Sequence, residues 1–156
     1  MFFLVALMQY RTFLKNSDDG CPFCERESFD KTVLVHETAR ARVTIAKAPY
    51  VPDQLLVMPK AHVVNFTDLT LLDAFHCFRL IRWAGKQLYR KGYKGYLVLM
   101  RDGDKVGKSI PHLHIHVIPN HDVSIQNGSR NRRVLTPSEI TKRVKGFLKL
   151  KANKEV

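Results

Sequence analysis

The chain has 156 residues, of which 45% are hydrophobic and 26% are charged. This composition excludes a disordered or collagen-like protein, and three cysteines are too few for a disulfide-rich scaffold. The 26 basic residues outnumber the 14 acidic ones, and the net charge of +12 favours anionic partners: nucleotides, nucleic acid or acidic lipid. No apolar run approaches the ~18 residues that a membrane span needs. We therefore expect one domain over residues 1–156, in the cytoplasm, without membrane attachment.

Short apolar stretches with alternating or compact patterns predict five strands. Two of them, residues 33–37 and 42–47, flank a short turn, and a third covers residues 54–58 and ends at a proline. The last two are residues 95–100 and 112–118. Neighbouring strands this short, joined by turns, favour a mostly antiparallel sheet.

Apolar residues at alternating spacings of three and four between positions 74 and 88 predict a long helix. Asp68 or Thr70 is expected to cap its first turn, and Gly92 to end it. Basic side chains fall mostly on the other side of this helix, so its outer surface is expected to be basic. Three further apolar residues are expected to widen the buried face: Leu71, Phe75 and Phe78.

Residues 136–139, with the sequence Thr-Pro-Ser-Glu, have the pattern of a capping box and predict a second helix near the C-terminus. The polar residues 120–133 before it show no period and predict a surface loop. The chain is thus expected to have an α+β fold of about five strands, one long helix and one C-terminal helix. Its core is expected over residues 21–120, and a basic loop and helix over residues 121–156.

Residues 112–118 alternate histidine with apolar residues, in the sequence His-Leu-His-Ile-His-Val-Ile. Alternate side chains of a strand lie on opposite faces, so His112, His114 and His116 share one face while the apolar residues face the core. Neutral imidazoles aligned in this way can bind a metal, bind phosphate or attack it. A structural metal site is the alternative interpretation of the same pattern.

The segment just before the histidines has the composition of an anion site. Gly107, Lys108 and Ser109 offer backbone N–H groups, a cation and a hydroxyl. Backbone N–H groups in such a turn can surround an anion. Together with the histidines, this segment indicates a phosphate site that contains a nucleophile.

Cys21 and Cys24 form a Cys-x-x-Cys pair, a spacing typical of metal ligands. A redox dithiol is the alternative, although no thioredoxin-like βαβ pattern surrounds the pair. Cys77 falls within the long helical pattern and is expected to be a small core residue.

The histidine pattern resembles the signature of the histidine triad (HIT) family of nucleotidyl hydrolases and transferases. The segment Gly-Lys-Ser before it resembles the family's Gly-x-Ser, and residues 55–62 resemble its strand leading to Pro-x-x-His. The resemblance extends over residues 21–120. Within the family, the sequence of these motifs is most similar to that of the branch that handles diadenosine polyphosphates.

This resemblance implies roles for individual residues. His114 would attack the α-phosphorus and form a nucleotidyl-histidine, while His116 and Ser109 would contact phosphate or the leaving group. Some members hold a structural zinc, which Cys21, Cys24, His62 and His112 would bind here. Gly107 and neighbouring N–H groups would stabilise charge on the phosphate. The other residues expected to bind nucleotide or phosphate are Lys47, Arg101 and Lys108.

Several positions depart from the family's usual residues. Ala46 and Lys47 stand where an acid or amide often holds the ribose hydroxyls, and Gln54 stands where histidine is common. Arg101 and Lys108 add cations where Asn, Gln or small residues are usual. We expect these two cations to favour a longer or more highly charged phosphate chain, unless both point to solvent.

The function expected from these residues is cleavage of a nucleoside phosphoanhydride, such as a diadenosine polyphosphate, by hydrolysis or phosphorolysis. Two alternatives stay open: a deadenylating HIT enzyme that acts on nucleic acid, which the net charge favours, and a non-catalytic nucleotide-binding module. The resemblance also implies a homodimer.

Overall fold

The computed structural model describes residues 21–24, 29–103, 105–120 and 133–152. Most of the expected loop at 120–133 lies outside these ranges. The described chain forms a five-stranded sheet in the order β1-β2-β3-β5-β4, with every neighbouring pair antiparallel. Within the described residues, no helix is both long and apolar enough to cross a membrane. The strands are β1 (Leu34–Glu37), β2 (Ala41–Ile45), β3 (Leu55–Pro59), β4 (Tyr96–Met100) and β5 (Ile115–Pro119).

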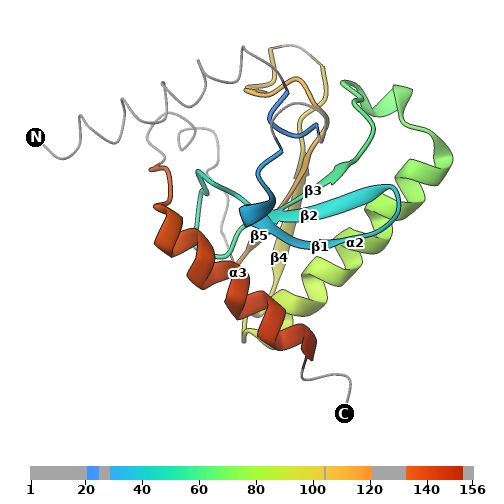
Figure 1. The fold of residues 1–156 in the computed structure, drawn as a ribbon. Helices are drawn as coiled ribbons and strands as arrows, with labels where there is room; N and C mark the ends of the chain where they lie inside the picture. Colours follow the sequence, from blue (N-terminus) through green and yellow to red (C-terminus); the bar gives the residue numbers. More distant parts are fainter. Residues whose placement is uncertain (1–20, 25–28, 104, 121–132, 153–156) are drawn as a thin grey trace, which may run out of the picture.

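Two helices cover one face of the sheet (Figure 1): the long α2 (Leu71–Arg90) and the C-terminal α3 (Pro137–Ala152). Short 3-10 turns at Lys31–Val33 and Phe66–Asp68 precede β1 and α2. This arrangement confirms the predicted α+β class with one long and one C-terminal helix. It leaves the opposite face of the sheet without a helix within the described part of the chain.

The two faces of the sheet carry different side chains because residues alternate along each strand. In β3, Leu55 and Val57 pack into the main core with Leu80 of α2 and Phe147 of α3. The intervening Leu56 belongs to a smaller cluster with Ala46 and Met58 on the other face.

The N-terminus of α2 confirms Thr70 as the cap. The Thr70 hydroxyl oxygen accepts a hydrogen bond from the Asp73 backbone N–H at 3.1 Å, and the hydroxyl donates to the Asp73 carboxylate at 2.5 Å. Arg40 forms an ion pair with the same carboxylate at 2.9 Å. Asp73 is buried at this end of the helix. These hydrogen bonds explain how a carboxylate is accommodated there.

The expectation that Leu71, Phe75 and Phe78 widen the buried face of α2 is wrong. Their exposed fractions are 91%, 56% and 69%. The stripe that faces the sheet consists of Cys77, Leu80, Ala84 and Leu88. The three exposed residues are themselves spaced by four and three, so they form a second apolar stripe, on the solvent side of the helix.

Strand β5 begins at Ile115, three residues later than the sequence predicts. The β3–β5 ladder pairs Val57 with Ile115 and Leu56 with His116. Before that point the chain turns to the segment that follows β3, where the Leu113 N–H donates to the Val63 carbonyl at 2.7 Å. His112 and His114 therefore precede the ladder, while His116 lies within it.

The C-terminal helix begins with the predicted capping box. The Thr136 N–H donates to the Glu139 carboxylate at 2.8 Å, and the Glu139 N–H donates to the Thr136 hydroxyl at 3.3 Å. Arg133 adds a bidentate pair with the same carboxylate. Hydrogen bonds from Arg133 and Thr136 lower the pKa of Glu139 to about 2.

The contact between Gly85 of α2 and Tyr96 of β4 gives a stability prediction. A Cβ at Gly85 would lie 2.4 Å from the Tyr96 ring, so Gly85→Ala must displace either this ring or the helix. We expect a loss of about 1–3 kcal/mol in the free energy of unfolding. Gly146→Ala in α3 is the control, because its Cβ would meet only the Lys91 ammonium at 3.9 Å, and alanine favours a helix over glycine by roughly 0.5–1 kcal/mol.

Urea unfolding of the two variants measures both effects. The double variant Gly85→Ala/Tyr96→Leu should recover part of the loss, since it removes the ring that clashes. A Gly85→Ala protein as stable as the unchanged chain would contradict the close approach.

Candidate functional site

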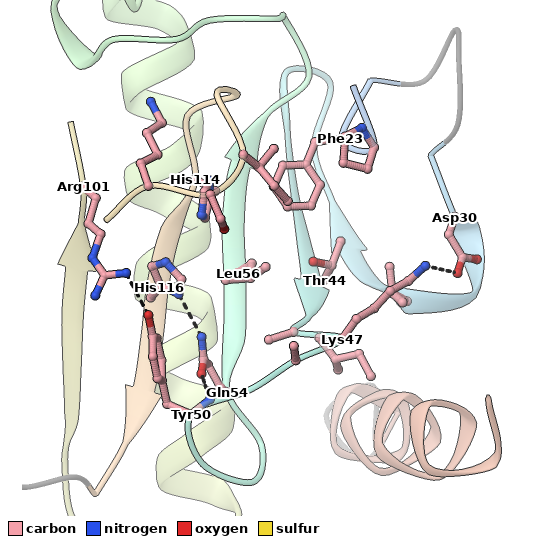
Figure 2. Close-up of a pocket in the computed structure, with 18 of the residues that line it drawn as sticks. Phe23, Asp30, Thr44, Lys47, Tyr50, Gln54, Leu56, Arg101, His114 and His116 are labelled. Carbon is pink, nitrogen blue, oxygen red and sulfur yellow. Dashed lines mark hydrogen bonds and ion pairs between the residues drawn. The ribbon is translucent and has the colours of Figure 1, made fainter. Parts of the chain in front are cut away.

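A pocket lies on the sheet face opposite α2 and α3, and both His114 and His116 line it (Figure 2). His114 and His116 are 8% and 5% exposed, so the imidazoles are largely shielded from water. Apolar side chains, among them Phe23, Val33 and Leu56, form much of the wall. The remaining lining is polar and includes Arg101 and the loop that contains Ser109.

Hydrogen bonds assign the tautomers of the first two histidines. His112 lies at 0% exposure and donates from Nε2 to the Pro59 carbonyl at 3.0 Å, so its Nδ1 carries the lone pair. His114 donates from Nδ1 to the His112 carbonyl at 2.8 Å, so its Nε2 carries the lone pair. Nε2 is consequently the nitrogen of the neutral His114 ring that could act as a nucleophile.

The third histidine has a different partner. Nδ1 of His116 lies 2.8 Å from the side-chain nitrogen of Gln54, a residue that is only 1% exposed. The rings of His114 and His116 lie edge to face with their centroids 5.0 Å apart. The Tyr50 ring lies 5.7 Å from His116 on another side.

The predicted phosphate residues line the same pocket. Gly107 and Ser109 are exposed and lie on its rim, and Gly107 has φ = +73°, a conformation that favours glycine. Arg101 donates from Nη1 to the Tyr50 hydroxyl at 2.8 Å and to the Gly107 carbonyl at 3.2 Å. Among the described residues no carboxylate pairs with Arg101, so its positive charge is available to an anion. The Lys108 ammonium donates to the Val64 carbonyl at the edge of the pocket.

Lys47 lines the pocket but lies far from Arg101, at the other end of the view in Figure 2. Its ammonium pairs with the Asp30 carboxylate at 2.8 Å. Burial alone would raise the pKa of Asp30, but hydrogen bonds from Lys47 and Thr32 lower it to about 2. At neutral pH this end of the pocket therefore contains an ionised carboxylate, paired with Lys47, which the sequence did not indicate.

Four potential metal ligands meet beside the pocket. The ligand atoms of Cys21, Cys24, His62 and His112 all lie within 4.8 Å of one another. Nδ1 of His112 is 3.3 Å and 3.6 Å from the two sulfurs, and Nδ1 of His62 is 3.1 Å from Cys24 Sγ. A tetrahedral zinc with bonds of ~2.0–2.3 Å would separate its ligand atoms by roughly 3.3–3.8 Å.

The donor set fits a metal chemically as well as geometrically. Burial lowers the pKa of His112 to about 4, which keeps its ring neutral, as a ligand must be. Its Nε2 proton on the Pro59 carbonyl directs Nδ1 toward the thiols. The residues brought together are those that the resemblance implied.

Phe23, inside the Cys-x-x-Cys turn, joins this cluster to the pocket. The turn is closed by a hydrogen bond from the Cys24 N–H to the Cys21 carbonyl at 3.0 Å. The Phe23 ring lies 5.8 Å from His112 and 5.3 Å from His114, edge to face. It also packs against the small cluster that contains Leu56. The metal-ligand turn thus supplies part of the pocket wall.

Two pocket residues were missed by the sequence interpretation. Asp30 pairs with a lysine from a distant part of the chain, and nothing in its local sequence indicates that contact. Gln54 was noted only as a departure from histidine, although this departure was a usable signal.

Comparisons with known proteins agree with this geometry. The HIT domain family model matches residues 27–123. The bis(5'-adenosyl)-triphosphatase of Saccharomyces cerevisiae is 35% identical over 80 residues, which are 49% of this chain and 38% of the yeast protein. This chain therefore matches well under half the length of that relative.

Solved structures show the same fold at lower identity. The diadenosine triphosphate hydrolase of Plasmodium falciparum, solved with cyclomarin A, aligns with a TM-score of 0.70 at 15% identity over 82% of each chain. A zinc-bound histidine triad protein of Mycobacterium smegmatis aligns with a TM-score of 0.55 at 20% identity, over 78% of this chain and 88% of the other.

Proposed function

The chain belongs to the HIT family, and from this premise we propose that it cleaves a phosphoanhydride bond of a nucleoside polyphosphate through a nucleotidyl intermediate on His114. The observation that carries the proposal is the 2.8 Å hydrogen bond from His114 Nδ1 to the His112 carbonyl. This bond makes Nε2 the nucleophile in a pocket that also contains a second imidazole and an arginine. The triphosphatase activity named for the yeast relative supports a dinucleoside polyphosphate as the substrate.

The reaction divides into two displacements. His114 Nε2 attacks the α-phosphorus, an N–P bond forms, and the anhydride P–O bond breaks with its electron pair on the leaving phosphate. The ring then carries a positive charge that the His112 carbonyl stabilises through the Nδ1 proton. Water or phosphate next attacks the phosphorus, the N–P electron pair returns to Nε2, and the acceptor releases its proton to solvent.

The residues around His114 supply charge and hydrogen bonds for this chemistry. Arg101 and the N–H groups near Gly107 would stabilise the negative charge that accumulates on the phosphate, and Ser109 would offer it a hydroxyl, since all three residues line the pocket together with His114. The carboxylate of Asp30 at the other end suits hydroxyl or amino donors of the nucleoside. Because Lys47 neutralises the Asp30 carboxylate, it is the positive charge of Arg101 that favours an orientation of the substrate with its phosphates toward Arg101.

We also propose that Cys21, Cys24, His62 and His112 hold a structural zinc. With four protein ligands the metal would have no open position, and its contribution would be to stabilise the turn that contains Phe23. It would also fix the ring of His112, whose backbone carbonyl orients His114.

The exposed apolar stripe of α2 supports a homodimer. Large apolar side chains gathered on one surface typically mark an interface. Leu71, Phe75 and Phe78 form such a surface on the solvent side of the helix. A second copy of the chain is the partner that we propose for it.

Turnover of diadenosine tri- and tetraphosphate, with and without inorganic phosphate, tests the proposed reaction. We expect His114→Ala to lose activity by at least about 10⁴-fold, because it removes the nucleophile. His76→Ala, on α2 across the sheet from the pocket, is the matched control and should retain activity. The products distinguish water from phosphate as the acceptor.

The same assay tests the proposed role of the two added cations. Arg101→Gln and Lys108→Gln should reduce the preference for the longer phosphate chain, whereas Lys86→Gln on α2 should not.

Absence of turnover in a folded, metal-loaded chain would contradict the proposed cleavage of a nucleoside polyphosphate. Adenylated DNA ends would then be the next substrate to assay.

Metal content tests the zinc site. After dialysis we expect about one zinc per chain, and a thiolate-to-metal charge-transfer band when cobalt replaces zinc. Cys24→Ser should lower the zinc content and weaken the charge-transfer band. Removal of the metal by a chelator should lower the free energy of unfolding by several kcal/mol, because a ligand at 1,000 times its Kd stabilises a protein by about 4 kcal/mol. Cys77→Ala is the control, because Cys77 lies on α2, is 2% exposed and is buried in the main core. Equal metal content in the unchanged chain and Cys24→Ser would rule out this ligand set.

Light scattering tests the homodimer. We expect a mass of two chains that falls to one in Phe78→Glu, because a buried carboxylate without a partner is costly. Leu148→Glu on α3, where the side chain is 43% exposed, is the control and should stay dimeric. A single-chain mass for the unchanged protein would exclude this partner.

A further inference from the structure

Gln54 occupies a buried position between the backbone of the β2–β3 loop and the third histidine. Its side-chain oxygen accepts a hydrogen bond from the Tyr50 N–H at 2.6 Å. Its side-chain nitrogen lies 2.8 Å from Nδ1 of His116. We propose that Gln54 is a positioning residue that holds His116 as the neutral tautomer with its proton on Nε2.

The assignment follows from the donors involved. A backbone N–H can only donate, so the Gln54 atom that meets the Tyr50 N–H must be the amide oxygen. The other amide atom is then the nitrogen, which can only donate. Nδ1 of His116 must accept this bond, so in the neutral ring the proton lies on Nε2.

The amide is held firmly enough to impose this choice. The Gln54 carbonyl accepts from the Ala46 N–H at 3.1 Å, and the Gln54 N–H donates to the Val51 carbonyl at 3.4 Å. The preceding Asp53 has φ = +64° and is fixed by Lys91 and the Tyr93 hydroxyl, both at 2.8 Å. A flipped amide would place two donors, the Tyr50 N–H and the amide nitrogen, against each other.

The neighbouring rings of His114 and His116 are therefore opposite tautomers. His114 presents an Nε2 lone pair because Nδ1 donates to a carbonyl. His116, one pleat further along, presents an Nε2 proton because Nδ1 accepts from Gln54. Resting on the proposed function, this proton would donate to a phosphate oxygen as charge accumulates there.

Ring nitrogen chemical shifts of His116 test the tautomer directly, in the full chain and without substrate. We expect an unprotonated Nδ1 and a protonated Nε2 in the unchanged protein. Gln54→Met should give averaged shifts, because the donor to Nδ1 is lost. Gln54→Glu should move a proton to Nδ1, because a carboxylate there can only accept. His114 should keep its tautomer in both variants.

Gln87→Met is the matched control, because Gln87 is another buried glutamine, at 2% exposure, on α2. It should leave the His116 shifts unchanged. In turnover, we expect Gln54→Met to lower kcat roughly tenfold with little change in KM. This is less than the ~10²–10³-fold cost of deleting a transition-state donor, since the Nε2 proton stays partly populated.

A protonated Nδ1 in the unchanged chain would overturn the inference, as would His116 shifts that neither Gln54 variant moves. These results do not depend on activity. If the shifts follow the expectation and no polyphosphate is turned over, the tautomer assignment stands and the proposed function fails.

Discussion

His112 is the residue on which the rest of the site depends. Its ring belongs to the Cys₂His₂ cluster, and its Nε2 proton is bound by the Pro59 carbonyl. Its own carbonyl accepts from His114 Nδ1 at 2.8 Å. One buried residue therefore connects the Cys-x-x-Cys turn, the end of β3 and the ring of His114, the proposed nucleophile. A change in the Cys₂His₂ cluster would be transmitted to His114 through the backbone of His112.

The sheet makes this arrangement possible because its two faces are used differently. Both helices bury the apolar residues of one face, including Val57 and Val117. The alternate positions of the same strands, such as Leu56 and His116, face the pocket. Along the same paired strands, alternate residues thus either pack in the core or line the pocket.

Much of this structure could be predicted from the sequence, and the exceptions have physical causes. The triad, the capping box at Thr136 and the four potential metal ligands follow local spacing or a resemblance. The exposure of Phe78 could not be predicted from helical spacing, because α2 carries two apolar stripes and only packing decides which one the sheet covers. The Asp30–Lys47 and Gln54–His116 contacts join distant parts of the chain, and no local pattern encodes them.

If His114 forms a covalent bond to phosphorus, the stereochemistry of the reaction at phosphorus will reveal it. A substrate with a chiral phosphorothioate at the α-position, cleaved in isotopically labelled water, reports the configuration of the product. Two successive in-line displacements, one by His114 and one by water, predict net retention. Inversion would mean a single direct attack by water and would contradict the nucleotidyl-histidine account.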